Sequence, residues 1–252
     1  MIPNPILKVL STMSCHTVRH LLIGGQACVL YGAAEFSRDC DLVILASEGN
    51  FSNFRQALVA LRAESIAVPQ FQPEYLGRGH AVHFRCRHPD VNGLRIDVMT
   101  RLRGCLPFEQ LWERRTTVED SGNGVTYEVL GIEDLVLAKK TQRDKDWPMI
   151  RRLVEAHYAA HGEEPSGARI SFWLRECRTP ALLIELRRRF PREFAEATST
   201  RPGLSTLGEF DADAIERLFR QEADEERRLD EEYWRPLKQE LEHLRRTRER
   251  PE

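Results

Sequence analysis

Short apolar runs alternate with amphipathic stretches along the first 130 residues of the chain. Apolar runs at 20–24 and 41–46 predict strands, and the second is unbroken, as is typical of a strand buried on both faces. Alternating stretches at 80–88 and 94–100 predict two more strands, joined by a turn at Asn92-Gly93. The other elements predicted in this part are helices at 4–14, 26–34, 51–63 and 107–118 and a strand at 125–130.

From Ile132 onward the chain shows only helical patterns. A long charged helical pattern begins at Asp211, and Pro236 inside it predicts a kink. We therefore expect a mixed α/β part at residues 1–135, followed by an all-helical part at residues 136–252.

The composition is that of an ordinary globular protein rather than of a disordered chain, with 41% hydrophobic and 30% charged residues. A formal net charge of −2 argues against a protein that coats nucleic acid by charge alone. No apolar run approaches the ~18–20 residues that span a bilayer, and the N-terminus does not show the pattern of a signal peptide. Six dispersed cysteines are typical of reduced thiols, so we expect a cytoplasmic protein with no membrane segment.

Four closely spaced residues form a candidate zinc site. His80, His83, Cys86 and His88 fall within nine residues. Zinc sites usually combine paired ligands from two separate places, whereas this run alternates as a strand does. A polar strand with exposed histidines is therefore the favoured interpretation.

Three carboxylates point more clearly to chemistry. Asp39 and Asp41 stand two residues apart at the start of a strand, so their side chains point to the same side. Asp97 lies inside an apolar strand, where a carboxylate is costly unless cations or hydrogen bonds compensate it. If the two strands are neighbours, the three acids converge and a divalent cation such as Mg²⁺ would relieve their repulsion. Upstream, Gly24 and Gly25 follow a strand and precede a helix, a place where glycines let the backbone approach a phosphate.

The run 21–45, LLIGGQACVLYGAAEFSRDCDLVIL, resembles the signature of the nucleotidyltransferase superfamily related to DNA polymerase β. The form GGxAxxxxG before the acids, together with EDLVLAKKTQRDKDW at 133–147, is most similar to the bacterial AbiEii-type branch, known as toxins of toxin–antitoxin and phage-defence systems. The resemblance covers about residues 20–155. Many relatives carry Arg-x-Thr-x-Asp, whereas this chain has Glu35, Ser37 and Asp39 in that register, a departure that bears on the acceptor more than on the metal chemistry.

The resemblance implies an α+β fold, with a nucleotidyltransferase-like mixed sheet flanked by helices and then an all-helical C-terminal part. It also implies Mg²⁺-dependent transfer of a nucleoside monophosphate from a nucleoside triphosphate such as ATP to an acceptor hydroxyl. Asp39 and Asp41 would bridge two Mg²⁺ ions, and Asp97 would hold the ion nearer the acceptor. Gly24 and Gly25 would cradle the triphosphate. The cationic side chains expected at its phosphates are Lys139 (the first choice), Lys140, Lys145 and Arg38.

The distribution of charged residues along the chain indicates what kind of acceptor the protein would bind. Residues 78–115 contain eight arginines against four acids, and residues 139–152 contain six basic residues against two acidic ones. This pattern fits an RNA acceptor such as tRNA, bound through its phosphates, and equally fits binding of the triphosphate alone. A protein hydroxyl or a small antibiotic-like acceptor also stays open. So do a catalytically silent nucleotide-binding module and an interaction protein whose charged C-terminal helix docks an antitoxin or a second copy of the chain.

Overall fold

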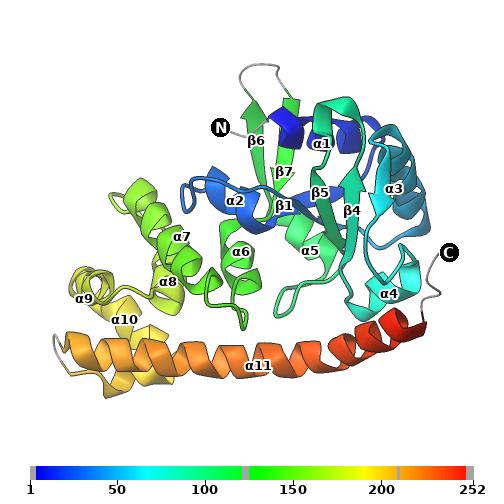
Figure 1. Cartoon of the computed structure of the whole chain (residues 1–252). Coiled ribbons are helices and arrows are strands. Elements are labelled where there is room, and N and C mark those ends of the chain that lie inside the picture. Colours follow the sequence, from blue (N-terminus) through cyan, green and yellow to red (C-terminus); the bar gives the residue numbers. More distant parts are fainter. Residues whose placement is uncertain (1–3, 121–124, 209–210, 248–252) are drawn as a thin grey trace. The chain divides into compact units, whose positions relative to one another are not determined.

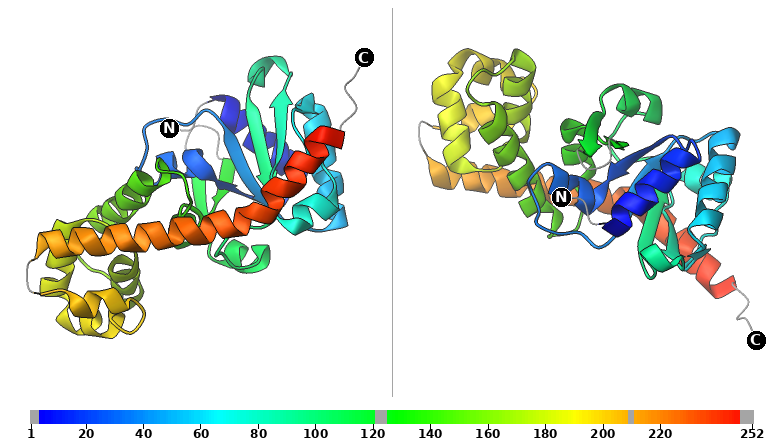
Figure 2. Two further views of the ribbon diagram at one scale, coloured as in Figure 1. Left: turned by 60° about the horizontal axis from the view of Figure 1, so that its bottom comes forward. Right: turned by 90° about the horizontal axis from the view of Figure 1, so that it is seen from above.

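The computed structural model describes residues 4–120, 125–208 and 211–247, and it divides the chain into two compact units (Figures 1 and 2). Unit 1 contains the chain up to Leu30, Ala34–Ala138 and the stretch from Glu232. Unit 2 contains Tyr31–Ala33 and Lys139–Glu231. The division therefore falls between Ala138 and Lys139, where the sequence predicts a boundary between residues 135 and 136.

Unit 1 is built on a seven-stranded sheet with the order β3-β4-β5-β2-β1-β7-β6. The pairs β2–β5 and β1–β7 are parallel and the others are antiparallel, so the sheet is mixed, as the sequence predicts. The strands are β1 (His20–Ile23), β2 (Cys40–Ile44), β3 (Ala63–Ser65), β4 (Val82–Cys86), β5 (Arg95–Met99), β6 (Thr116–Asp120) and β7 (Val125–Val129).

The helices of unit 1 include α3, which shows how local sequence sets an element. Ser47 lies at its N-cap and accepts a hydrogen bond from the backbone N–H of Asn50, which satisfies one of the donors left open in the first turn. Phe54 of α3 packs edge-on against Phe84 of β4, with ring centroids 5.9 Å apart. The helices are α1 (Asn4–Cys15), α2 (Gly24–Leu30), α3 (Glu48–Ala60), α4 (Pro73–Arg78), α5 (Phe108–Glu113) and α6 (Ile132–Ala138).

Unit 2 is helical. Its core centres on Trp173, which is fully buried and donates a hydrogen bond from Nε1 to Nδ1 of His157 at 2.9 Å. Its elements are α7 (Asp146–His161), α8 (Gly167–Glu176), α9 (Pro180–Arg189), α10 (Pro191–Ala197), a 3₁₀ turn (Pro202–Thr206) and the first part of α11 (Ala212–Thr247). Figure 2 shows α11 as one continuous helix, in orange to red, and it continues through Pro236.

Most predicted elements are present, although α2 ends at Leu30 rather than at residue 34, and α3 spans Glu48–Ala60 rather than 51–63. The helix expected at 107–118 ends at Glu113, and β6 begins at Thr116. Two β-branched threonines favour the strand, and Arg115 is bound to Glu128 of β7 at 2.6 Å, a long-range contact that local helical spacing does not reveal. The helix α4 and the strand β3 lie in a stretch that the sequence suggests is a loop. None of the described helices combines the length and apolar character needed to cross a membrane.

Candidate functional site

Gly24, at the end of β1, has a left-handed backbone with φ +69°. A Cβ placed there would lie 1.9 Å from Oδ2 of Asp41 and 2.7 Å from its Cβ. A Cβ on Gly25 would lie 2.6 Å from Oγ of Ser37. Gly24 therefore requires glycine, because its backbone is left-handed and Asp41 fills the space that a side chain would take, whereas a side chain at Gly25 would require the Ser37 hydroxyl to turn away.

Two of the three predicted carboxylates face each other across neighbouring strands. Asp41 of β2 and Asp97 of β5 are register partners in a parallel pair, so both side chains lie on the same face of the sheet. Asp39 lies two residues before Asp41 and just precedes the strand. Cys40, between them, is fully buried, and burial together with the nearby carboxylates raises its pKa well above the ordinary thiol value. The condition that the two strands are neighbours is therefore met for Asp41 and Asp97.

Asp97 is bound by two side chains that were not predicted from the sequence to be its partners. The ring nitrogen Nδ1 of His83 lies 2.8 Å from Oδ1, and Nε of Arg95 donates to the same oxygen at 2.6 Å. Nη2 of Arg95 also lies 3.0 Å from Nδ1 of His83. Because Nδ1 carries either a hydrogen or a lone pair, His83 donates to Asp97 or accepts from Arg95, but does not do both at once.

These partners determine the protonation of Asp97. Burial alone would raise the pKa of this carboxyl, but the hydrogen bonds from His83 and Arg95 outweigh burial and lower the pKa below its ordinary value. Asp97 is therefore an anion at neutral pH. Both contacts end on Oδ1, so within the described residues Oδ2 has no hydrogen-bonding partner. The sequence contained a signal for both partners: Arg95 stands two residues from Asp97 on one strand, and His83 lies in the alternating strand of the same predicted hairpin.

Metal binding at this site depends on how many ligand side chains come together. Within the described residues, no three His, Cys, Asp or Glu side chains come together in an arrangement that could hold a metal ion. Carboxylate oxygens are nevertheless the ligands that Mg²⁺ prefers, and Asp41 and Asp97 supply them from adjacent strands. The residues thus fit Mg²⁺ by the chemistry of their oxygens.

The histidines weighed as zinc ligands have other roles. His80 is 1% exposed and its Nε2 lies 2.7 Å from Oε2 of Glu240, while His83 contacts Asp97. The strand prediction for this run is confirmed, but the expectation that its histidines are exposed is wrong for His80. The reason is packing: Glu240 belongs to the C-terminal part of α11, more than 150 residues away in the sequence.

The cationic residues predicted at the phosphates lie in different surroundings. Arg38, in unit 1, is exposed and its guanidinium lies 5.9 Å from the centre of the Phe36 ring. The three lysines belong to unit 2. Lys145 is exposed at the start of α7, whereas Lys139 and Lys140 are held by carboxylates.

Lys139 donates from Nζ to Oδ1 of Asp146 at 3.0 Å, and Thr141 and Arg143 donate to Oδ2 at 2.6 and 2.8 Å. Burial would raise the pKa of Asp146, but Lys139 and these hydrogen bonds lower it. Lys140 lies 2.8 Å from Oε2 of the buried Glu176. The two lysines thus stabilise buried anions within unit 2, and their predicted contact with a triphosphate stays a prediction.

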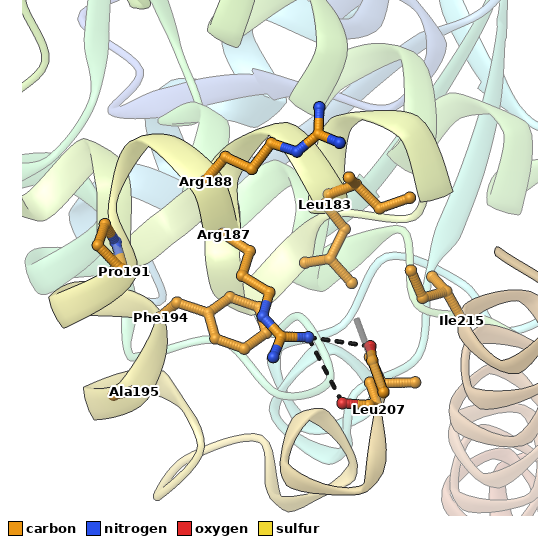
Figure 3. Close-up of a pocket in the computed structure, with 10 residues that line it drawn as sticks. Leu183, Arg187, Arg188, Pro191, Phe194, Ala195, Leu207 and Ile215 are labelled. Atoms are coloured by element: carbon orange, nitrogen blue, oxygen red, sulfur yellow. Dashed lines mark hydrogen bonds between the residues drawn. The ribbon is translucent and has the colours of Figure 1, made fainter. Parts of the chain in front are cut away.

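Two further features stand apart from the predicted residues. Gln26, next to Gly25, is fully buried, and neither its amide oxygen nor its amide nitrogen has a hydrogen-bonding partner among the residues that the structure describes. A cavity of about 430 Å³ lies in unit 2 (Figure 3). Its walls include Leu183 and Phe194, and Arg187 donates across it to the backbone carbonyls of Leu207 and Gly208. It contains none of the residues predicted to bind a nucleotide or a metal.

No protein-family model matches the chain, and no curated protein matches it in sequence. Two solved structures are similar in fold. One is an antigenic nucleotidyltransferase-like protein from Paracoccidioides brasiliensis, 18% identical, with 84% of this chain and 89% of that chain covered and a TM-score of 0.40. The other is a candidate nucleotidyltransferase from H. pylori, 13% identical, with 90% and 94% covered and a TM-score of 0.40. These similarities assign no chemical activity to this chain, so its chemistry follows from its own side chains.

Proposed function

We propose that the chain is a Mg²⁺-dependent nucleotidyltransferase that moves a nucleoside monophosphate from a nucleoside triphosphate to an acceptor hydroxyl. The observation that carries this proposal is the pairing of Asp41 with Asp97 across parallel strands, beside a turn where Gly24 leaves room for the Asp41 carboxylate. Asp41 and Asp97 are half-buried carboxylates on one sheet face, and a cation between them would reduce their mutual repulsion.

In this proposal Asp39, Asp41 and Asp97 hold Mg²⁺, which when bound offsets the charge of the triphosphate. Gly24 and Gly25 bring the backbone close to the phosphates. The acceptor oxygen forms a bond to the α-phosphorus, the bond from that phosphorus to the bridging oxygen breaks, and pyrophosphate leaves with the electron pair. Asp97, an anion at neutral pH, orients the acceptor hydroxyl and accepts its proton.

For the phosphates of the leaving group we propose cationic contacts from Arg38 and Lys145, which are exposed, as well as from Lys139 and Lys140. Arg38 stands directly before Asp39, and Lys145 starts α7. Lys139 and Lys140 would have to exchange Asp146 and Glu176 for phosphate oxygens in order to bind a triphosphate.

RNA, and tRNA in particular, is the proposed acceptor, since the arginine-rich stretch 78–115 includes the strand of Asp97. Action as a toxin controlled by an antitoxin partner is the proposed biological setting. One observation favours a second candidate, a catalytically silent binding module: Oδ1 of Asp97 is already bound to Arg95 and His83.

Binding and turnover of the four labelled nucleoside triphosphates, with and without Mg²⁺ and in the presence of total tRNA, test the proposal. We expect Mg²⁺-dependent label transfer in the wild type and none in Asp41→Asn, a variant that keeps the shape of the side chain. Asp90→Asn is the matched control, because Asp90 is an exposed carboxylate of unit 1 outside the site. Binding without transfer to any acceptor would support the silent module, and absence of Mg²⁺-dependent binding would refute the metal site.

A further inference from the structure

The sheet face that carries Asp97 also carries a row of basic side chains. Burial alternates along β4 and β5, so that Val82, Phe84, Ile96 and Val98 face the core. The residues between them, on the opposite face, are half-buried or exposed: they are His83, Arg85, Arg95, Asp97 and Met99. On this second face Arg85 is exposed and Arg95 is partly exposed, so a ligand can reach the face at these two arginines.

Arg85 and Arg95 lie directly opposite each other on this face, as register partners of the antiparallel pair β4–β5. Like charges in this relation destabilise a sheet, so the pair opposes the stability of the hairpin. Arg85 is exposed and forms no hydrogen bond or ion pair with any residue that the structure describes. The nearest acid in the next strand, its register partner Glu64, is bound instead to Arg87 at 3.2 Å.

Arg95 joins this pair to the carboxylate site. Its Nε donates to Asp97 and its Nη2 contacts His83, while its side chain is still 39% exposed. Two arginines at partner positions of neighbouring strands, one of them anchored on Asp97, carry planar donors that match the oxygens of a phosphate.

We propose that Arg85 and Arg95 bind a backbone phosphate of an RNA acceptor and so place its hydroxyl beside Asp97. This inference rests on the proposed function and specifies the acceptor as a polyanion. In this arrangement Arg85 is a positioning residue, because the phosphate that it binds lies away from the reacting atoms.

The strand order separates this phosphate from those of the nucleoside triphosphate. Gly24 follows β1, and β2 and β5 lie between β1 and β4. At about 4.8 Å per strand, Arg85 lies roughly 14 Å across the sheet from the glycine turn. A triphosphate held at Gly24 and Gly25 is therefore expected to end short of Arg85, whereas a nucleic-acid strand that reaches Asp97 continues across it.

The experiment measures binding of a fluorescent single-stranded RNA oligonucleotide by anisotropy over a range of salt concentrations. It compares the wild type with Arg85→Gln, Arg85→Lys and Arg192→Gln. Arg192 is an exposed arginine of α10 in unit 2 and controls for net charge. A fluorescent nucleoside triphosphate with Mg²⁺ serves as the second probe.

We expect Arg85→Gln to weaken RNA binding about fivefold at 0.1 M salt and to lower the slope of log K against log salt by about 0.7, the values for one lost phosphate contact on a single strand. Arg85→Lys should recover part of the loss, and Arg192→Gln should bind as the wild type does. Binding of the nucleoside triphosphate should not change in any variant.

Four results would overturn the inference. Equal loss in Arg85→Gln and Arg192→Gln would show a general charge effect, and loss of nucleoside triphosphate binding in Arg85→Gln would assign the phosphate to the donor. A wild type that binds Mg²⁺ and the nucleoside triphosphate but not RNA would refute this inference and leave the proposed function standing. A wild type that binds neither probe would refute both.

Discussion

The close approach of Asp41 to Gly24 predicts how much stability the protein loses when Gly24 is replaced by alanine. In Gly24→Ala the new methyl group would lie 1.9 Å from Oδ2 and 2.7 Å from Cβ of Asp41. The Cβ contact cannot be relieved by turning the carboxylate alone, so the turn or β2 must move. We expect about 1–3 kcal/mol for this overpacking and a further ~1–2 kcal/mol for alanine in a left-handed conformation.

Gly93→Ala is the matched control. Gly93 also has a left-handed backbone, with φ +81°, but a Cβ there would meet nothing within 4 Å. Both variants share the conformational strain and the loss of chain entropy in the unfolded state. The difference between them therefore isolates the contact with Asp41.

Calorimetric unfolding of the two variants measures that difference. For a chain of this size about 1 kcal/mol corresponds to roughly 2–4 °C in Tm, so Gly24→Ala should unfold roughly 2–12 °C below Gly93→Ala. Gly24→Ala should also weaken Mg²⁺-dependent nucleotide binding, because it displaces a proposed metal ligand. Equal Tm values for the two variants would refute the packing of Asp41 against Gly24.

The lowered pKa of Asp97 predicts a pH-dependent contribution to stability. This contribution is fully present above the ordinary carboxyl pKa of 3.8 and is lost as the pH falls through the lower pKa of the folded protein. In urea titrations, the difference in unfolding free energy between the wild type and Asp97→Asn should therefore shrink below about pH 4. A constant difference from pH 7 to pH 2.5 would argue against the contact with Arg95. In unit 2, Lys139→Met should lose about 3 kcal/mol, because it leaves the buried Asp146 without its ammonium partner, while the exposed Lys145→Met should stay within about 0.5 kcal/mol. If both lysine variants unfold at the same urea concentration, the ion pair with Asp146 does not contribute to stability.

Local patterning accounts for most of the elements. The apolar run of β2 and the alternation in β4 and β5 depend on residues close in the chain, and the structure confirms them. The same holds for the all-helical character after Ile132 within the described residues. Two strands, β3 and β6, were not predicted. β3 pairs with β4 about twenty residues further along, a relation that no local pattern shows, whereas β6 lies next to β7 in the chain and was assigned to the end of a helix.

The candidate site divides in the same way. The spacing of Asp39, Asp41 and Asp97 and the glycine pair were readable from the sequence, since they depend on strand alternation and on a turn. Only the tertiary structure brings Asp41 and Asp97 into register, a relation that depends on how β2 pairs with β5.

Tertiary structure also decided what surrounds these residues. It placed His83 and Arg95 on Asp97, filled the space at Gly24 with Asp41, and bound Lys139 to Asp146. Residue type and spacing define which groups are available for chemistry, whereas the contacts of each group, and hence its charge and freedom to bind a ligand, arise when distant segments pack together.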